Sequence, residues 1–439
     1  MTGLEIGFAS IVVMLILIYS GLHVAITLML VSFVGVWMIR DNPDMAAKLM
    51  VAAFKDSISD YLFGVVPLFV LMGLVVSVAG IGRDTFDVAQ QAFRKILGGL
   101  GVATVAANAI FAAITGISIA SAAVFTKVAV PEMRRHGYTP HFSVGVVAGS
   151  AVLGMLIPPS LLFILYGVLT EQSVGDLFIA GVIPGLVLAM TYGLGIVAMG
   201  RWAPGFIGGT NTPVDDMPTM SVGEMLAKLA PIVVLVALVL GGIYGGIFTP
   251  TEAGAVGSGL TILIALAQRE FSFAAVWTAA KQAVEGTASI FIIAVGAGLF
   301  ARYMALTGVP DFLADQFLTL GDSPIILILQ ISLLYLLLGC FIDSIGIMLL
   351  TLPIILPLLN EANVDLIWFG VLVIKLLEIG LVTPPVGLNV FVMKSSLGRL
   401  VTLPQIFRGV LWFIAVDLVT LGLLIAFPEI STWLPSLMQ

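Results

Sequence analysis

Two proline pairs in apolar surroundings decide the fold of this chain. Residues 150–167 read SAVLGMLIPPSLLFILYG, and residues 378–392 read EIGLVTPPVGLNVFV. Each pair removes two backbone donors and disfavours a helical conformation in the residue before it, so each segment should contain a broken helix. Irregular backbone at membrane depth persists where it lines a cavity or binds a ligand. The sequence therefore predicts two broken helices, with the breaks inside 153–160 and 379–387.

The composition describes a protein solvated by hydrocarbon. Of 439 residues, 60% are hydrophobic and 10% are charged, whereas an ordinary soluble domain has about 25% charged residues. The mean hydropathy is +1.17. At about 20 residues per spanning helix, the chain forms many spans and leaves no stretch for a soluble catalytic domain. We expect a polytopic membrane protein in contact with the lipid bilayer.

The distribution of reactive and charged residues excludes several function classes. The net charge of −7 contains no long block of like charge, so no nucleic-acid partner is expected. The single cysteine, Cys340, cannot form an internal disulfide, and the three histidines lack metal-ligand spacing. The spans carry no nucleophile with a base at fixed spacing and no ring of like charge, which argues against an intramembrane enzyme and against a pore.

Ten apolar runs predict membrane crossings. They lie at about 5–20, 22–39, 61–80, 142–170, 177–200, 228–248, 253–267, 285–306, 365–396 and 408–427. Two further apolar regions, 97–131 and 324–360, are interrupted midway by polar or turn residues, at 115–118 and 343–346. Each region is either two crossings or one re-entrant hairpin.

The flanking charges favour hairpins, because cytoplasmic connections carry an excess of Lys and Arg. Arg94 and Lys95 precede the first region, and Arg134 and Arg135 follow it. The second region is flanked only by acidic residues, which are Asp311, Asp315, Asp322, Glu361 and Asp365. The two hairpins should therefore enter from opposite faces of the membrane, with both chain termini on the outer face.

An internal repeat connects these features. An offset of 226 residues (118 to 344) aligns Ser118 with Ser344 and each proline pair with the other. The same offset aligns Pro131 with Pro357 and Gly154 with Gly380. An amphipathic stretch at 42–59 has a counterpart near 270–285. Because the hairpins enter from opposite faces, this is an inverted-topology repeat, which is typical of secondary transporters with a site at the midplane.

The repeat predicts an all-α polytopic fold in four parts. These are scaffold helices with a first amphipathic arm at 1–60; a first transport repeat at 61–200, with hairpin 97–131 and broken helix 142–170; scaffold helices with a second arm at 201–284; and a second transport repeat at 285–427, with hairpin 324–360 and broken helix 365–396.

The two proline segments, together with PEMRRHGY at 131–138 and LGCFIDSIGIMLLTLPIILP at 338–357, resemble the large membrane (M, DctM-like) subunit of tripartite ATP-independent periplasmic (TRAP) transporters. The resemblance covers nearly the whole chain. It implies an elevator-type, Na⁺-coupled importer of an organic acid in the bacterial inner membrane, with a C4-dicarboxylate or a sugar acid such as sialic acid as substrate. It implies two partners, a small four-helix membrane subunit (Q type) and a periplasmic substrate-binding protein (P type), and no cofactor beyond the coupling ion. A stand-alone Na⁺-coupled dicarboxylate carrier or exchanger is the alternative.

Oxygen ligands freed at the tips and breaks are suited to Na⁺, and the amide of Asn389 is suited to a substrate carboxylate. Compared with the family pattern of small hydroxyl residues at the first tip, Ile117 offers only its carbonyl. The predicted Na⁺ residues are Thr115, Gly116, Ser118, Gly154, Ile157, Asp343, Ser344, Gly380 and Thr383. The predicted substrate residues are Ser118, Pro158, Pro159, Ser160, Pro384, Pro385, Gly387 and Asn389.

Four charged residues in the spans are expected to have roles other than binding the ion or the substrate. Lys375 and Glu378 lie three residues apart on one helical face and are predicted to neutralise each other. Arg302 lies near the end of its span and is expected to snorkel to an interface, although a cation there would also attract an anion. For Asp417, alone in the last span, we suggest a partner in a neighbouring subunit.

Overall fold

The computed structural model describes residues 2–59, 64–209, 220–268, 272–320 and 323–438. The described residues form helices throughout, with one isolated bridge between Tyr138 and Gly208. This confirms the predicted all-α class.

The helices are α1 Gly3–Tyr19, α2 Val24–Arg40, α3 Pro43–Ser59, α4 Val65–Val78, α5 Ile81–Phe93, α6 Gly99–Thr115, α7 Ser118–Arg135, α8 Pro140–Ala151, α9 Leu153–Leu156, α10 Leu161–Thr170, α11 Val174–Trp202, α12 Pro204–Ile207, α13 Val222–Tyr244, α14 Pro250–Ala267, α15 Phe273–Thr307, α16 Val309–Leu320, α17 Pro324–Gly339, α18 Ser344–Glu361, α19 Leu366–Val382, α20 Leu388–Leu397, α21 Leu403–Ala426 and α22 Glu429–Ser436.

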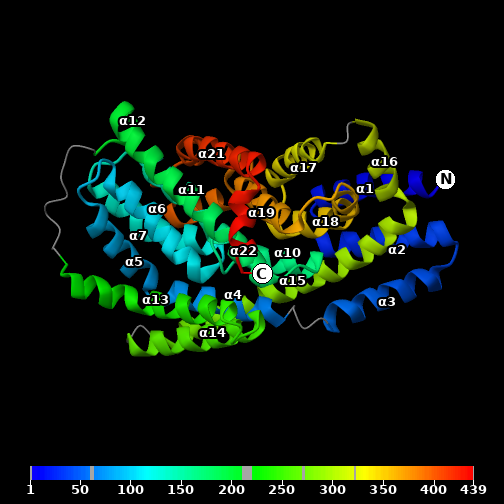
Figure 1. Ribbon diagram of the computed structural model, residues 1–439, viewed down its shortest axis with the longest axis horizontal. Coiled ribbons are helices and arrows are strands. Elements are labelled where there is room, and N and C mark those ends of the chain that lie inside the picture. The colour runs from blue at the N-terminus through cyan, green and yellow to red at the C-terminus, as the bar shows by residue number, and fades with distance from the viewer. Residues whose placement is uncertain (1, 60–63, 210–219, 269–271, 321–322, 439) are drawn as a thin grey trace.

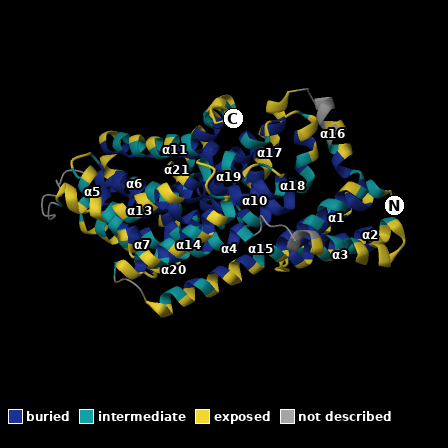
Figure 2. Ribbon diagram, turned by 60° about the horizontal axis from the view of Figure 1, so that its bottom comes forward, coloured by how far each residue is buried: buried dark blue, intermediate teal, exposed yellow. Residues whose placement is uncertain are grey.

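The molecule is elongated, with α1, α2, α3 and α16 at one end and α5, α6, α7 and α13 at the other (Figure 1). Between them lie α10, α18 and α19, where Figure 2 shows buried residues concentrated. Every residue of α19 from Trp368 to Val382 is buried. The core is thus built around the second predicted broken helix and the elements that touch it.

Seven of the described helices are long and apolar enough to cross a membrane when α8 to α10 count as one span. Six of them correspond to predicted crossings, those at 142–170, 177–200, 228–248, 253–267, 285–306 and 408–427, and the seventh, α18, lies in the interrupted region 324–360. A further span is formed if α4 and α5, bent by 63°, count together. The shorter helices α1, α2, α6 and α17 are also apolar. The protein is therefore a multi-pass membrane protein.

The sequence repeat is also a structural repeat. α7 begins at Ser118 and ends at Arg135, and α18 begins at Ser344 and ends at Glu361. Both ends of the two helices therefore match at the offset of 226 residues (118 to 344). The repeats interlock, because α2 packs on α15 while its counterpart α14 packs on α4. Likewise α20, after the second break, packs on α7, and α10, after the first break, packs on α18. Each half-helix thus contacts the hairpin of the other repeat.

The second amphipathic arm differs from the prediction. The stretch at 270–285 and the crossing at 285–306 are not separate, because Phe273–Thr307 forms one helix of 35 residues. No proline interrupts this stretch, and Gly286 is exposed, so nothing in the sequence stops the helix. The first arm is a separate helix, α3, as predicted.

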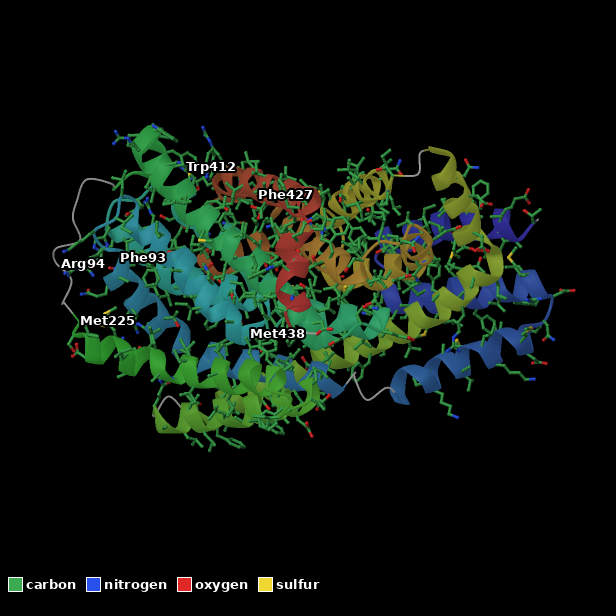
Figure 3. All side chains as sticks on the ribbon, viewed as in Figure 1. Phe93, Arg94, Met225, Trp412, Phe427 and Met438 are labelled. Atoms are coloured by element: carbon green, nitrogen blue, oxygen red, sulfur yellow. The ribbon has the colours of Figure 1, made fainter. Side chains whose placement is uncertain are left out.

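Two amphipathic helices, α5 and α16, were not predicted as separate elements. α5 is amphipathic and follows α4 after a sharp bend. Figure 3 places Arg94 and Met225 at the same end of the molecule, where α5 ends and α13 begins. There Lys228 pairs with Asp84 at 2.9 Å and with Asp87 at 2.6 Å, which ties α5 to α13. The equivalent helix in the second repeat is α16.

Candidate functional site

The tip of the first hairpin is fixed to the break in the first broken helix. α6 ends at Thr115, and Gly116 follows with a left-handed φ of 60°. Its carbonyl accepts a hydrogen bond from Leu161 N at 3.2 Å, at the start of α10. A Cβ added to Gly116 would lie 2.6 Å from Pro159 O, so only glycine fits this close approach. The hairpin and the break therefore form one unit.

The tip of the second hairpin docks in a related way. α17 ends at Gly339, whose Cα would lie 2.6 Å from a Cβ added to Gly380 of α19. Val386 N, in the second break, donates to Cys340 O at 3.3 Å. Each repeat thus presents a hairpin tip against its own broken helix, as predicted for a transporter with a midplane site.

The two tips, the second break and the start of α10, which follows the first break, line one cavity of about 620 Å³. Ile117 and Leu161 line it from the first repeat, and Asp343 and Gly387 line it from the second. Residues of α15 and of the connection between α1 and α2 close the remaining side, including Ser289 and His23. The cavity therefore lies where both hairpins meet α15 and the connection between α1 and α2.

The predicted Na⁺ residues of the first repeat are brought together. A Cβ added to Gly154 would lie 2.9 Å from the Cα of Ser118, and Ser118 is fully buried. Thr115 donates its hydroxyl hydrogen to Phe111 O at 3.1 Å, which leaves lone pairs on the oxygen. Ile157 is the first residue of the break, since α9 ends at Leu156. The group offers hydroxyl and carbonyl oxygens from three elements.

The predicted Na⁺ residues of the second repeat also lie near one another, and their side chains make hydrogen bonds to backbone groups. Asp343 is the N-cap of α18, and its carboxylate accepts from Gly346 N at 2.9 Å. Ser344 donates to Leu377 O at 3.4 Å, and Thr383 donates to Ile379 O at 2.6 Å. An N-cap position favours an acidic residue at this tip.

The predicted substrate residues fall into two environments. Pro158, Pro159 and Ser160 are buried, and Ser160 caps α10 by accepting from Phe163 N at 3.4 Å. Pro384 and Pro385 are exposed in the described chain. The two proline pairs, equivalent in sequence, thus differ in their surroundings.

Asn389, a further predicted substrate residue, lies on α20 close to the cavity. It is fully buried, and both its Oδ1 and Nδ2 lack a hydrogen-bond partner among the described residues. Gly387, two residues before it, lines the cavity. An unpartnered buried amide is costly, so a ligand that bonds it would gain free energy.

Glu378 is a site residue that the sequence reasoning missed. Its carboxylate accepts a hydrogen bond from Ser118 Oγ at 2.5 Å. It is fully buried, and its Oε2 has no partner among the described residues. Glu378 therefore joins the second broken helix to the first hairpin tip. The sequence feature that could have identified Glu378 is its position in an apolar segment, two residues before Gly380.

The predicted pairing of Lys375 with Glu378 is wrong. Lys375 makes its ion pair with Asp417 of α21, and Asp417 also accepts from the Tyr192 hydroxyl at 2.6 Å. Asp417 therefore has its partners in its own chain, which corrects the suggestion of a neighbouring subunit. Helix periodicity compares residues one turn apart and cannot find a partner 42 residues away.

Arg302 is half-buried on α15.

Comparison with known proteins agrees with this geometry. The model of the family described as "Tripartite ATP-independent periplasmic transporter, DctM component" matches residues 11–430. The chain belongs to the DctM family. A C4-dicarboxylate TRAP transporter large permease protein DctM of Pseudomonas aeruginosa is 33% identical over 420 residues, covering 95% of this chain and 93% of the relative. The sialic acid TRAP transporter large permease protein SiaM of Vibrio cholerae is 31% identical over 426 residues, covering 96% of each.

The fold of this DctM-family chain also resembles a solved structure. The Alcanivorax borkumensis YdaH transporter, whose crystal structure is described as revealing an unusual topology, matches with a TM-score of 0.60 at 12% sequence identity. The match covers 89% of each chain. The relatives are transporter permeases and not enzymes, so the chain is a TRAP transporter large permease.

Proposed function

We propose that this DctM-family chain is the large membrane subunit of a Na⁺-coupled secondary transporter that imports an organic acid across the bacterial inner membrane. The observation that carries the proposal is the arrangement of two hairpin tips on two broken helices around one shared cavity. Irregular backbone at this depth offers ligands to ions and polar substrates.

Na⁺ is the proposed coupling ion, because the chain contributes hard oxygen ligands at both tips. In the first repeat these are hydroxyl and carbonyl oxygens of residues 115–118 and of the break that begins at Ile157. In the second repeat they come from Asp343, Ser344 and the break that begins at Thr383. An ion gradient would then supply the free energy of uptake.

The proposed substrate is a carboxylate. Asn389 has a free amide donor, and it lies in the first turn of α20, where helical N–H groups give a positive potential. The two relatives are named for a C4-dicarboxylate and for sialic acid, both of which carry carboxylates. A C4-dicarboxylate or a sugar acid is therefore the proposed class.

The proposed mechanism is an elevator. The interlocked helices α2, α4, α14 and α15 would form the stationary scaffold, and the hairpins with the broken helices would move as one body. This proposal moves α4 and the second half of α15, which the sequence-based division placed in the transport repeats, into the scaffold. The tip contacts at Gly116 and Gly339 support this division, because they join each hairpin to its broken helix within a repeat. Movement of that body past the scaffold would carry the cavity between the two sides.

Reconstitution with and without the proposed partners tests the assembly. We expect substrate uptake into proteoliposomes only when the chain is purified with a small membrane subunit and a periplasmic binding protein is added outside. The reason is that the chain receives its substrate from a carrier protein. Uptake by the chain alone, at the same rate and without either partner, would instead support the stand-alone dicarboxylate carrier.

A further inference from the structure

The two hairpin tips, equivalent by sequence offset, differ in what their serines contact. Ser118 donates to the Glu378 carboxylate at 2.5 Å, whereas Ser344 donates to a backbone oxygen, Leu377 O, at 3.4 Å. The offset of 226 residues (118 to 344) places Val152 at the position equivalent to Glu378. An apolar side chain cannot orient a hydroxyl, so the carboxylate contact belongs to the first tip alone.

The charges around Glu378 are unbalanced. Glu378, Lys375 and Asp417 are all fully buried. The Lys375 ammonium donates to Asp417, so its charge is matched by that carboxylate. With both carboxylates ionised, the three groups carry one excess negative charge, next to an Oε2 that has no partner in the described chain. A buried charge at membrane depth is costly unless a counter-charge neutralises it.

We infer that Glu378 is the positioning residue and the counter-charge of the ion bound at the first hairpin tip. The inference rests on the proposed Na⁺ coupling and extends it to a residue of the opposite repeat. Because Glu378 accepts the Ser118 hydrogen, the lone pairs of Ser118 Oγ are turned away from the carboxylate and remain free for a cation. The negative charge of Glu378 compensates the positive charge of that cation without touching it.

Two consequences follow for the mechanism. The ion sites of the two repeats are chemically different, since only the first has a carboxylate behind its serine. Ion binding at the first tip also acts on the second broken helix, because Glu378 lies on α19 while Ser118 lies on α7.

The inference is tested by the Na⁺ dependence of thermal stability of the purified protein, without substrate. Glu378→Gln removes the charge but keeps the size and an oxygen that accepts from Ser118. We expect it to raise the Na⁺ concentration for half-maximal stabilisation about tenfold or more, as for the loss of one charged interaction. The substrate concentration for half-maximal uptake at saturating Na⁺ should stay unchanged, which a general packing defect would not produce.

A double-mutant cycle separates action through Ser118 from a general effect. In a Ser118→Ala background, Glu378→Gln should add little, because the oriented ligand is already lost. In a Ser344→Ala background, which is the matched control from the second repeat, the full effect of Glu378→Gln should remain. Equal effects in the two backgrounds would overturn the positioning role.

The remaining outcomes are also decisive. If Na⁺ stabilises the unsubstituted protein and Glu378→Gln has the same half-maximal Na⁺ concentration, the inference is overturned while the proposed coupling stands. If Na⁺ does not stabilise the unsubstituted protein, both are overturned. If Glu378→Gln does not fold, Glu378→Asp provides a second test, because it keeps the charge but moves it back by one methylene. Glu378→Asp should also weaken Na⁺ binding. An unchanged Na⁺ dependence of this variant would refute the inference.

Discussion

Replacing Asp417 by alanine is expected to destabilise the protein by about 3–5 kcal/mol, the usual effect of removing one partner of a buried ion pair. Lys375 and Asp417 are both fully buried, so the substitution would leave the Lys375 ammonium without a counter-charge. It would also remove the acceptor of the Tyr192 hydroxyl. A large drop in the melting temperature of the purified protein in detergent should follow.

Two variants control this measurement. Asp315 is exposed on α16, so Asp315→Ala should change stability by less than about 0.5 kcal/mol. The double substitution Lys375→Met with Asp417→Leu removes both charges and should recover most of the stability lost in Asp417→Ala. If the double variant melts as early as Asp417→Ala, lost packing and not an uncompensated charge is the cause.

Asn389→Ala is expected to raise the substrate concentration for half-maximal uptake by roughly one to two orders of magnitude, because a hydrogen bond to a charged group contributes about 1.5–3 kcal/mol. The amide of Asn389 is buried without a partner and lies two residues from the cavity lining at Gly387. Transport assays with the binding protein in excess measure this change. The Na⁺ concentration for half-maximal uptake should change far less.

Ser395 provides a matched control on the same helix. It is exposed and donates to the backbone at Val392 O, so Ser395→Ala should leave uptake unchanged. The substrate role of Asn389 is contradicted if Asn389→Ala behaves like this control. It is also contradicted if the variant raises the Na⁺ and substrate requirements equally while lowering the melting temperature, since Asn389 would then serve only helix packing.

The elements of the site were predictable because their signals are local. A proline pair removes two successive backbone donors, so the two pairs located the breaks, although α9 and α19 extend to Leu156 and Val382, further than expected. Polar interruptions marked the hairpin tips at 115–118 and 343–346. The constant offset of the repeat then predicted that the hairpin tips lie near the breaks, because two repeats with the same order of elements adopt the same fold.

The contacts of the charged residues were not predictable in this way. Glu378 meets Ser118 across 260 residues, and Lys375 meets Asp417 across 42. Such pairs depend on how α19 lies against α7 and α21, which no periodicity describes. The sequence also does not distinguish two roles for Asp343, because a helix N-cap and an ion ligand both favour an acidic residue at a hairpin tip.

The dependence of uptake on a Na⁺ gradient tests the central claim most directly. Proteoliposomes that contain the complete transporter should accumulate the substrate when Na⁺ is high outside and low inside, without ATP, because we propose that the oxygen ligands at the tips bind Na⁺ as the coupling ion. Replacement of Na⁺ by choline at constant pH should reduce uptake to the level of empty liposomes. Accumulation that continues at the same rate in choline would contradict the account.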